Sequence, residues 1–166
     1  MLNPNCVGIN IRIYFCQGQQ LTMAKLPFTI QELTRAWRDA TAVSNVEPRK
    51  NPHRLLLFYA VECGLKAVFL TQRNLDIIDE DNAALLSHDL NKIASLVLLP
   101  KAQLLPEGVS MKNCNINKTS TPRNCHVSQL NQVWRYGGKL TGPGTITDLM
   151  LEQKLLQINA WINKEL

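Results

Sequence analysis

The chain of 166 residues lacks the features that mark secreted, disulfide-stabilised and membrane-spanning proteins. Its first 22 residues show no basic segment followed by an apolar segment and a small-residue cleavage site, so they predict no secretory signal. Five cysteines form an odd set without a Cys-x-x-Cys pair, which argues against a disulfide framework. The longest apolar run, residues 55–70, is interrupted by Glu62 and Lys66 and is shorter than the roughly 20 residues of a membrane helix. We therefore expect a cytoplasmic protein with no membrane segment.

The motifs of the common enzyme classes are also missing. The sequence contains no glycine-rich phosphate loop, no pair of catalytic carboxylates, and no Ser or Cys nucleophile with a neighbouring base. Cys114, Cys125 and His126 come nearest to a metal site, but their spacing does not match a zinc finger and no fourth ligand is evident. We expect neither a metal site nor a cofactor.

The length and the composition of the chain indicate one folded domain. A chain of this length buries roughly two-thirds of its unfolded surface, and a hydrophobic content of 45% can supply the core. Residues 1–22 are an extension of uncertain status, either an appended short strand or translated upstream sequence, because Met23 begins a more ordinary N-terminus. We predict a single helical domain over residues 23–166.

Two helices are predicted in the first half of this domain. Thr29 and Glu32 have the spacing of a capping box, which predicts a helix from about Ile30 to about Asn45. Asn51 and Pro52 are typical of a second helix start, and we expect Asn51 to be the N-cap of a helix that ends near Arg73. Core positions are expected in the second helix at Leu56, Phe58, Leu65 and Val68.

The second half predicts further helices separated by a long loop. Ser87 is the expected cap of a helix that stops at Pro100, and a later helix ends at Gly137. Residues 106–124 are polar and without periodicity, which predicts an irregular loop. No segment strongly indicates a sheet. The predicted fold is therefore all-α, an up-and-down bundle of four to five helices.

The last helix is predicted to start with a capping box formed by Thr145 and Asp148. An apolar stripe follows at Leu151, Leu155, Ile158, Ile162 and Leu166, and further apolar residues lie on the other faces of the helix. This helix has more apolar surface than one neighbour would cover. A homodimer is one way to cover it.

Charged residues on the predicted second helix form a narrow stripe. Glu62 and Lys66 lie four residues apart on that stripe, together with Tyr59 and Arg73. The stripe is either a solvated face or a contact with another subunit or with a polar group inside the protein. The net charge of +5 is a mild indication of nucleic-acid binding.

Two stretches of the chain resemble the HEPN superfamily. They are "RLLLFYAVECGLKAVFL", residues 54–70, and "SHDLNKIASL", residues 87–96. The matching positions are Ala60, Glu62, Leu65, Lys66 and Ala67, followed by His88, Asp89 and Leu90. In addition, "WRYGG" at 134–138 is similar to an Arg-Tyr-Pro motif that some members carry late in the domain. The resemblance covers roughly residues 29–166.

The resemblance implies a helical bundle that is commonly a homodimer. It also implies a polar contact between Glu62 and Lys66 and the segment around His88 and Asp89. Many HEPN proteins are metal-independent ribonucleases of toxin–antitoxin and antiviral systems, with four to six residues between a catalytic Arg and the His that follows it. This chain has three histidines, and none follows an Arg at that spacing. Arg49 and His53 have three residues between them, and Arg123 and His126, the alternative catalytic pair, have two.

We therefore predict a noncatalytic or atypical HEPN-like component of a prokaryotic antiviral defence or toxin–antitoxin system, which binds RNA or a partner protein. Two alternatives stay open: a metal-independent ribonuclease that uses Arg123 and His126, and a helical adaptor without nucleic-acid contact. Arg135 and Tyr136 are the main candidates for RNA or partner binding, because an Arg can hold phosphate and a Tyr can stack on a base. Basic residues Arg49, Lys50 and Arg54 are further candidates.

Overall fold

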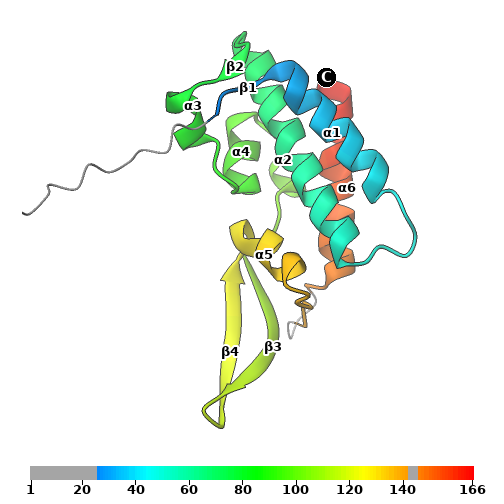
Figure 1. Ribbon diagram of the computed structural model, residues 1–166, viewed down its shortest axis with the longest axis vertical. Coiled ribbons are helices and arrows are strands. Elements are labelled where there is room, and N and C mark those ends of the chain that lie inside the picture. The colour runs from blue at the N-terminus through cyan, green and yellow to red at the C-terminus, as the bar shows by residue number, and fades with distance from the viewer. Residues whose placement is uncertain (1–25, 142–145) are drawn as a thin grey trace, which may run out of the picture.

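The computed structural model describes residues 26–141 and 146–166, without the side chains of residues 80, 81 and 84 (Figure 1). The expectations for residues 1–22 and for Thr145 lie outside the described residues. The helices are α1 (Ile30–Ser44), α2 (Asn51–Arg73), α3 (Glu80–Leu85), α4 (Leu90–Leu96), α5 (Leu130–Arg135) and α6 (Asp148–Glu165), with short 3-10 turns η1 (Lys101–Gln103) and η2 (Val127–Gln129). The strands are β1 (Phe28–Thr29), β2 (Ile77–Ile78), β3 (Gly108–Ile116) and β4 (Thr119–His126).

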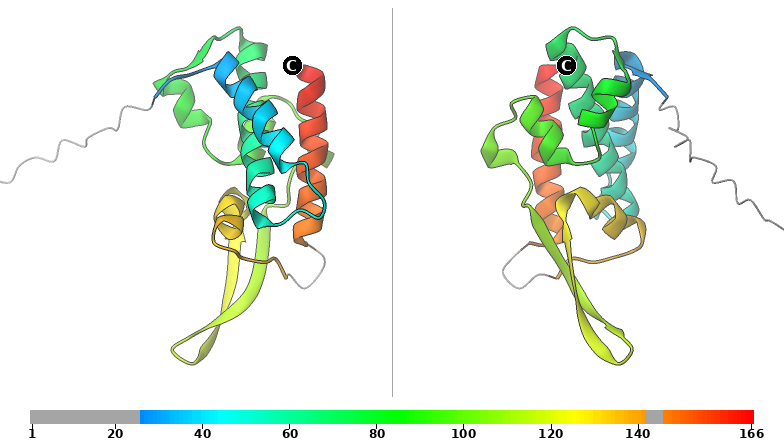
Figure 2. Two further views of the ribbon diagram at one scale, coloured as in Figure 1. Left: turned by 45° about the vertical axis from the view of Figure 1, so that its right-hand side comes forward. Right: turned by 90° about the vertical axis from the view of Figure 1, so that its left-hand side faces the viewer.

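The three long helices α1, α2 and α6 pack side by side (Figures 1 and 2). α2 packs against both α1 and α6, and α1 also reaches α6 through Trp37 and Thr41. α2 runs opposite to α1 and in the same direction as α6 (Figure 1). The shorter α4 and α5 lie against the remaining side of α2. The fold is mainly helical, as predicted, with α2 at its centre.

α1 begins as its sequence predicts. The Thr29 hydroxyl accepts a hydrogen bond from the Glu32 amide at 3.2 Å, and the Glu32 carboxylate accepts one from the Thr29 amide at 2.8 Å. The hydrogen bonds that the Thr29 amide and hydroxyl donate to this carboxylate lower the pKa of Glu32. Leu33 and Trp37 are buried on the inner face of α1, and the Trp37 indole donates to Asn159 of α6 at 2.6 Å.

α2 is the core helix. Phe58, Leu65 and Val68 are buried as predicted, whereas Leu56 is only half-buried. At Gly64 an added Cβ would lie 2.8 Å from Ile162, so this glycine allows α6 to approach α2 closely. α2 is long and apolar enough to cross a membrane, but 61% of its most apolar window is buried inside the fold, as in the central helix of a packed protein.

Three predicted helix starts are corrected by the structure. α2 begins at Asn51, which does not cap the helix but donates from its side chain to the Gly138 carbonyl at 2.7 Å. α4 is capped by Asp89, not by Ser87, and ends at Leu96 because the backbone turns into the left-handed region at Leu98. α6 is capped by Thr147, which accepts from the Met150 amide at 3.2 Å. In α4 and α6 the capping side chain is the short polar one that immediately precedes the first helical residue.

The predicted absence of sheet is wrong, and so is the irregular loop at 106–124. β3 and β4 form an antiparallel hairpin that projects from the helices, and β1 and β2 form a second pair of two residues each (Figures 1 and 2). The hairpin turns at Asn117 and Lys118, whose φ angles of 51° and 64° are those of a type I′ turn. This turn matches the twist of the flanking strands. The pairing therefore forms although the strands are rich in Asn, Ser and Thr.

The hairpin contains one bulge. Between the pairs Met111↔Arg123 and Cys114↔Thr121, β3 has two residues while β4 has only Pro122. Proline has no N–H to donate to the ladder, so an extra residue on the facing strand is expected here. The Arg123 side chain donates to the Lys112 carbonyl, at 2.7 Å, in this bulge.

Candidate functional site

A polar seam runs along the side of α2 that faces α4 and α5. Tyr59, Glu62 and Lys66 share this side because they are three and four residues apart on the helix. His88, just before α4, bonds to Glu62, and Arg135, at the end of α5, bonds to Tyr59. Together these five residues form what we call the α2 seam.

Glu62 is the centre of the α2 seam and is only 6% exposed. Its carboxylate accepts from Lys66 Nζ at 2.6 Å, and His88 Nδ1 lies 3.0 Å from both of its oxygens. A buried carboxylate needs such partners because desolvation penalises its charge. The His88 side chain is 69% exposed, and Nε2 is the ring nitrogen that remains for a ligand.

The predicted contact between the second helix and the segment around His88 is present for Glu62 and His88. Asp89 is used differently, because its carboxylate accepts from the Lys92 amide at 3.2 Å and caps α4. Within residues 26–141 and 146–166, no ion pair joins Lys66 to Asp89. The solvated-face interpretation of Glu62 is wrong, since the carboxylate is buried.

The end of α5 presents Arg135 and Tyr136 at the surface. The Gly138 amide donates to the Val133 carbonyl at 2.7 Å and the Gly137 amide donates to the Trp134 carbonyl at 3.3 Å, which is a Schellman motif. Gly137 has the positive φ, 71°, that this motif requires. The chain therefore leaves the helix sharply.

Trp134 anchors this helix end in the core. Its indole nitrogen donates to Asp148 Oδ1 at 2.8 Å, and Asp148 also accepts from the Leu140 amide at 3.2 Å. Next to this buried anchor, Tyr136 is 78% exposed and Arg135 donates to the Tyr59 hydroxyl. That hydrogen bond raises the pKa of Arg135, so the guanidinium stays charged. A cation and an aromatic ring are thus held side by side on a rigid base.

A cavity of about 340 Å³ lies between α5 and the β3–β4 hairpin. It is lined by Met111, Arg123, Cys125, Gln129, Gln132, Val133, Tyr136 and Gly138. Two residues predicted as functional, Arg123 and Tyr136, therefore share one cavity. Its polar lining groups are amides, a phenol and a guanidinium, which can donate hydrogen bonds to an anionic or polar ligand.

The structure separates Arg123 from His126. On β4 the even-numbered residues are exposed while Thr121, Arg123 and Cys125 are half-buried, so residues three apart lie on opposite faces of the hairpin. His126 Nδ1 is 2.8 Å from the Ser128 hydroxyl, at the start of η2. One chain therefore does not bring this Arg and this His to a common substrate.

Arg49 and Arg54 face a residue that no sequence motif singled out. Glu152 of α6 is buried and lies 3.2 Å from Arg49 and 3.0 Å from Arg54. Arg49 is itself buried and also donates to the Ser44 carbonyl at 2.9 Å, which disfavours a role in RNA or partner binding. Lys50, which precedes α2, is exposed. The only feature of the sequence that could have indicated Glu152 is its position next to Leu151, which belongs to the apolar stripe of α6.

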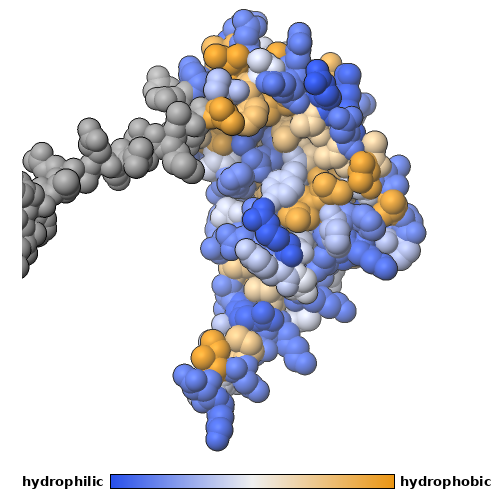
Figure 3. Space-filling model, in the orientation of Figure 1, coloured by the Kyte–Doolittle hydropathy of each residue, from blue (hydrophilic) through white to orange (hydrophobic). Residues whose placement is uncertain are grey.

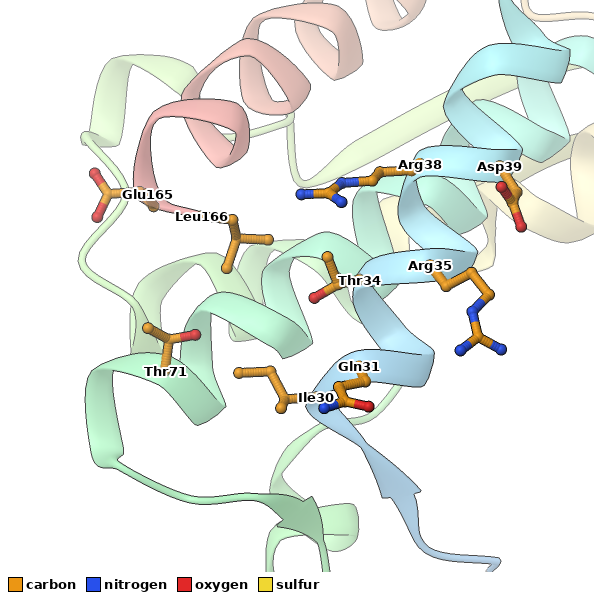
Figure 4. A pocket seen from close by; sticks show the side chains of 9 residues that line it. All are labelled: Ile30, Gln31, Thr34, Arg35, Arg38, Asp39, Thr71, Glu165 and Leu166. Atoms are coloured by element: carbon orange, nitrogen blue, oxygen red, sulfur yellow. The ribbon is translucent and has the colours of Figure 1, made fainter.

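A larger open cavity of about 520 Å³ lies between α1, the end of α2 and the C-terminal end of α6 (Figure 4). Arg38 extends toward this space, whereas Arg35 and Asp39 lie on the outer side of α1 (Figure 4). Both signs of charge line it, since Glu165 lies at the opposite wall. This mixture favours no particular class of ligand, and no residue predicted to be functional lines the cavity.

Within the part of the chain that the structure describes, no group of three or more His, Cys, Asp or Glu side chains could hold a metal ion. Cys114 and Cys125 are free thiols, and burial raises the pKa of Cys125.

Comparison of the chain with protein-family models, with curated proteins and with solved structures finds no match.

Proposed function

We propose that the chain is a noncatalytic HEPN-like component of a prokaryotic antiviral defence or toxin–antitoxin system, and that it binds RNA through Arg135 and Tyr136. In this proposal the helices form an up-and-down bundle that acts as a homodimer. The mainly helical fold and the contact between Glu62 and His88 agree with the resemblance in sequence. The alternative ligand of the surface formed by Arg135 and Tyr136 is a partner protein of the same system.

The observation that carries the proposal is the presentation of Arg135 and Tyr136. Tyr136 is 78% exposed although it adjoins the buried Trp134 anchor, so its ring is available for stacking on a base. Arg135 is held by Tyr59 and can still turn its other donors to a phosphate. Arg123 adds a second cation at the cavity that Tyr136 lines. Neither role requires a proton transfer.

RNA binding by the full chain is the direct test, with a fluorescent single-stranded RNA and tRNA in EDTA. Arg135→Ala should raise Kd about tenfold or more, because a charge-assisted hydrogen bond contributes about 1.5–3 kcal/mol. Arg73→Ala is the matched control, since Arg73 also ends a helix and rests on the Phe69 ring at 4.1 Å. Kd for this control should stay within about twofold of the native value.

Tyr136 offers a second pair of variants. Tyr136→Ala should weaken RNA binding by about 1–3 kcal/mol, whereas Tyr136→Phe should retain most of it, because stacking needs the ring and not the hydroxyl. Equal binding by Arg135→Ala, Tyr136→Ala and the native chain would contradict the assignment of this surface. Absence of RNA binding by the native chain would favour the helical adaptor or a protein partner.

A metal-independent ribonuclease is the second candidate, and the Glu62–His88 pair favours it. A carboxylate at 3.0 Å from His88 Nδ1 orients the imidazole and leaves Nε2 for an acid–base role. Incubation of the RNAs without metal and separation on a denaturing gel tests this candidate. Cleavage that His88→Gln abolishes and His126→Ala leaves intact would replace the noncatalytic proposal. Cleavage abolished by His126→Ala would instead support the pair Arg123 and His126.

A further inference from the structure

The β3–β4 hairpin, residues 108–126, is an arm that projects from the helical body (Figures 1 and 2). Its base is anchored by backbone hydrogen bonds. The Val127 amide donates to the Glu107 carbonyl at 2.9 Å, and the Thr141 amide donates to the Ser110 carbonyl at 3.1 Å. Met111 forms a bridge to Leu140, and beyond it β3 continues to Ile116. At about 3.3 Å per residue, this outer part extends about 17 Å past its last anchor.

The outer part of the arm is held mainly by its own contacts. Asn113 donates to the Ser120 hydroxyl at 3.2 Å, and Asn117 and Lys118 close the turn. A two-stranded hairpin without a packed face is marginally stable in water. The outer edge of each strand also presents backbone N–H and C=O groups that do not take part in the hydrogen bonds between β3 and β4. An arm of this kind gains stability when a partner covers it.

The charge of the arm indicates what that partner is. Residues 108–126 contain Lys112, Lys118 and Arg123 and no aspartate or glutamate. The remaining side chains of the outer part are mostly Asn, Ser and Thr, with Cys114, Ile116 and Pro122 as the exceptions, and Ile116 is 54% exposed. Figure 3 shows the same mainly hydrophilic surface with one apolar spot on the arm. Such a surface is complementary to a polyanion rather than to an apolar protein groove.

We propose that the arm binds the sugar–phosphate backbone of a nucleic acid through Lys112, Lys118 and Arg123. This inference rests on the proposed function and deepens it, because it adds a second surface to that of Arg135 and Tyr136. The two surfaces are continuous, since Arg123 and Tyr136 line the same cavity between the arm and α5. A strand held at Arg135 can therefore pass along the arm.

The test compares two variants of the full chain that each lose three positive charges. The arm variant is Lys112→Thr, Lys118→Gly and Arg123→Thr: threonine favours strands, and glycine suits the φ of 64° at residue 118. The control variant is Arg35→Gln, Lys101→Gln and Lys164→Gln, at exposed positions on the helical body. Far-UV circular dichroism and thermal unfolding check that both variants fold. Binding is measured against single-stranded RNA, duplex RNA and duplex DNA over a series of salt concentrations.

We expect the arm variant to raise Kd about tenfold or more near 0.1 M salt and to lower the salt slope by about 2 to 3, because each phosphate contact contributes about 0.7–0.9 to the slope. The control variant should keep both values. The preferred probe identifies the form of nucleic acid.

Equal slopes for the arm and control variants would overturn the inference while the proposed function, tested by Arg135→Ala, would stand. If the native chain binds none of the three probes at low salt, both fail. If the arm variant instead changes a dimer to a monomer in size-exclusion chromatography with light scattering and leaves binding intact, the arm is a contact between copies and the inference is overturned.

Discussion

Substitution of Glu152 by Gln should destabilise the protein strongly, because it removes a buried charge that two arginines share. The Glu152 side chain is 4% exposed, and its two oxygens lie 3.2 Å from Arg49 Nη1 and 3.0 Å from Arg54 Nε. Glutamine has nearly the same shape, so packing is preserved. Its amide group, however, carries no charge and would turn N–H donors toward one of the two guanidinium groups.

The expected cost follows from what remains around the arginines. Removing one partner of a buried ion pair costs about 3–5 kcal/mol, because the other charge stays buried. Arg49 keeps acceptors at the Ser44 carbonyl and Asn45 Oδ1, which places the expected loss near the lower end, about 3 kcal/mol. For a protein of this size this corresponds to a decrease in Tm of about 6–12 °C.

Glu47 provides a matched control on the same arginine. Its carboxylate lies 2.6 Å from Arg49 Nη1, but its side chain is 75% exposed. Water screens that pair, so Glu47→Gln should cost no more than about 1 kcal/mol. Urea unfolding followed by circular dichroism gives both free energies of unfolding. A loss below about 1 kcal/mol for Glu152→Gln, or equal losses for the two variants, would refute the argument that burial of Glu152 makes its charge structurally necessary.

Three further predictions test the fold. Gly64→Ala should cost about 1–3 kcal/mol, since its Cβ would lie 2.8 Å from Ile162; a neutral effect on urea unfolding would mean that α2 and α6 are not in close contact. Burial raises the pKa of the Cys63 thiol, so at pH 8 iodoacetamide should label Cys63 more slowly in the folded protein than in urea; peptide mass spectrometry that finds equal rates would contradict its burial. Thr29→Ala should cost about 0.5–2 kcal/mol at pH 7. The Thr29 amide and, to a smaller extent, the Thr29 hydroxyl donate to Glu32 and lower its pKa below the ordinary 4.5. Alanine loses only the hydroxyl contribution, which is present above that pH and declines as the carboxylate is protonated. The difference from the native chain should therefore be smaller at pH 3 than at pH 7.

Local patterns in the sequence were sufficient for the long helices. Thr29 and Glu32 were expected to close a capping box and do so, because all the groups involved lie within four residues. The apolar periodicity of α2 likewise predicted a helix that ends at Arg73. The contact between Glu62 and His88 was expected only from the resemblance to a family, since the residues are 26 positions apart.

The hairpin depended on pairing that its composition does not indicate. Its strands are mostly polar, and its turn is Asn-Lys rather than the Asn-Gly that marks a type I′ turn in a sequence. Arg123 and His126 looked close as residues three apart. Side chains alternate between the two faces of a strand, so residues three apart lie on opposite faces. They would lie on the same face only if this segment were a helix or a turn.

The sequence by itself determined where the long helices form and which of their faces are apolar, because these properties depend on neighbours within one or two turns. Tertiary structure alone decided that Arg49 and Arg54 face Glu152, across 103 and 98 positions of the chain, and that Arg135 reaches Tyr59 across 76. A charged side chain can pair with any opposite partner that packing brings near it. The partner depends on how α2, α5 and α6 pack against one another, and no local sequence pattern predicts that packing.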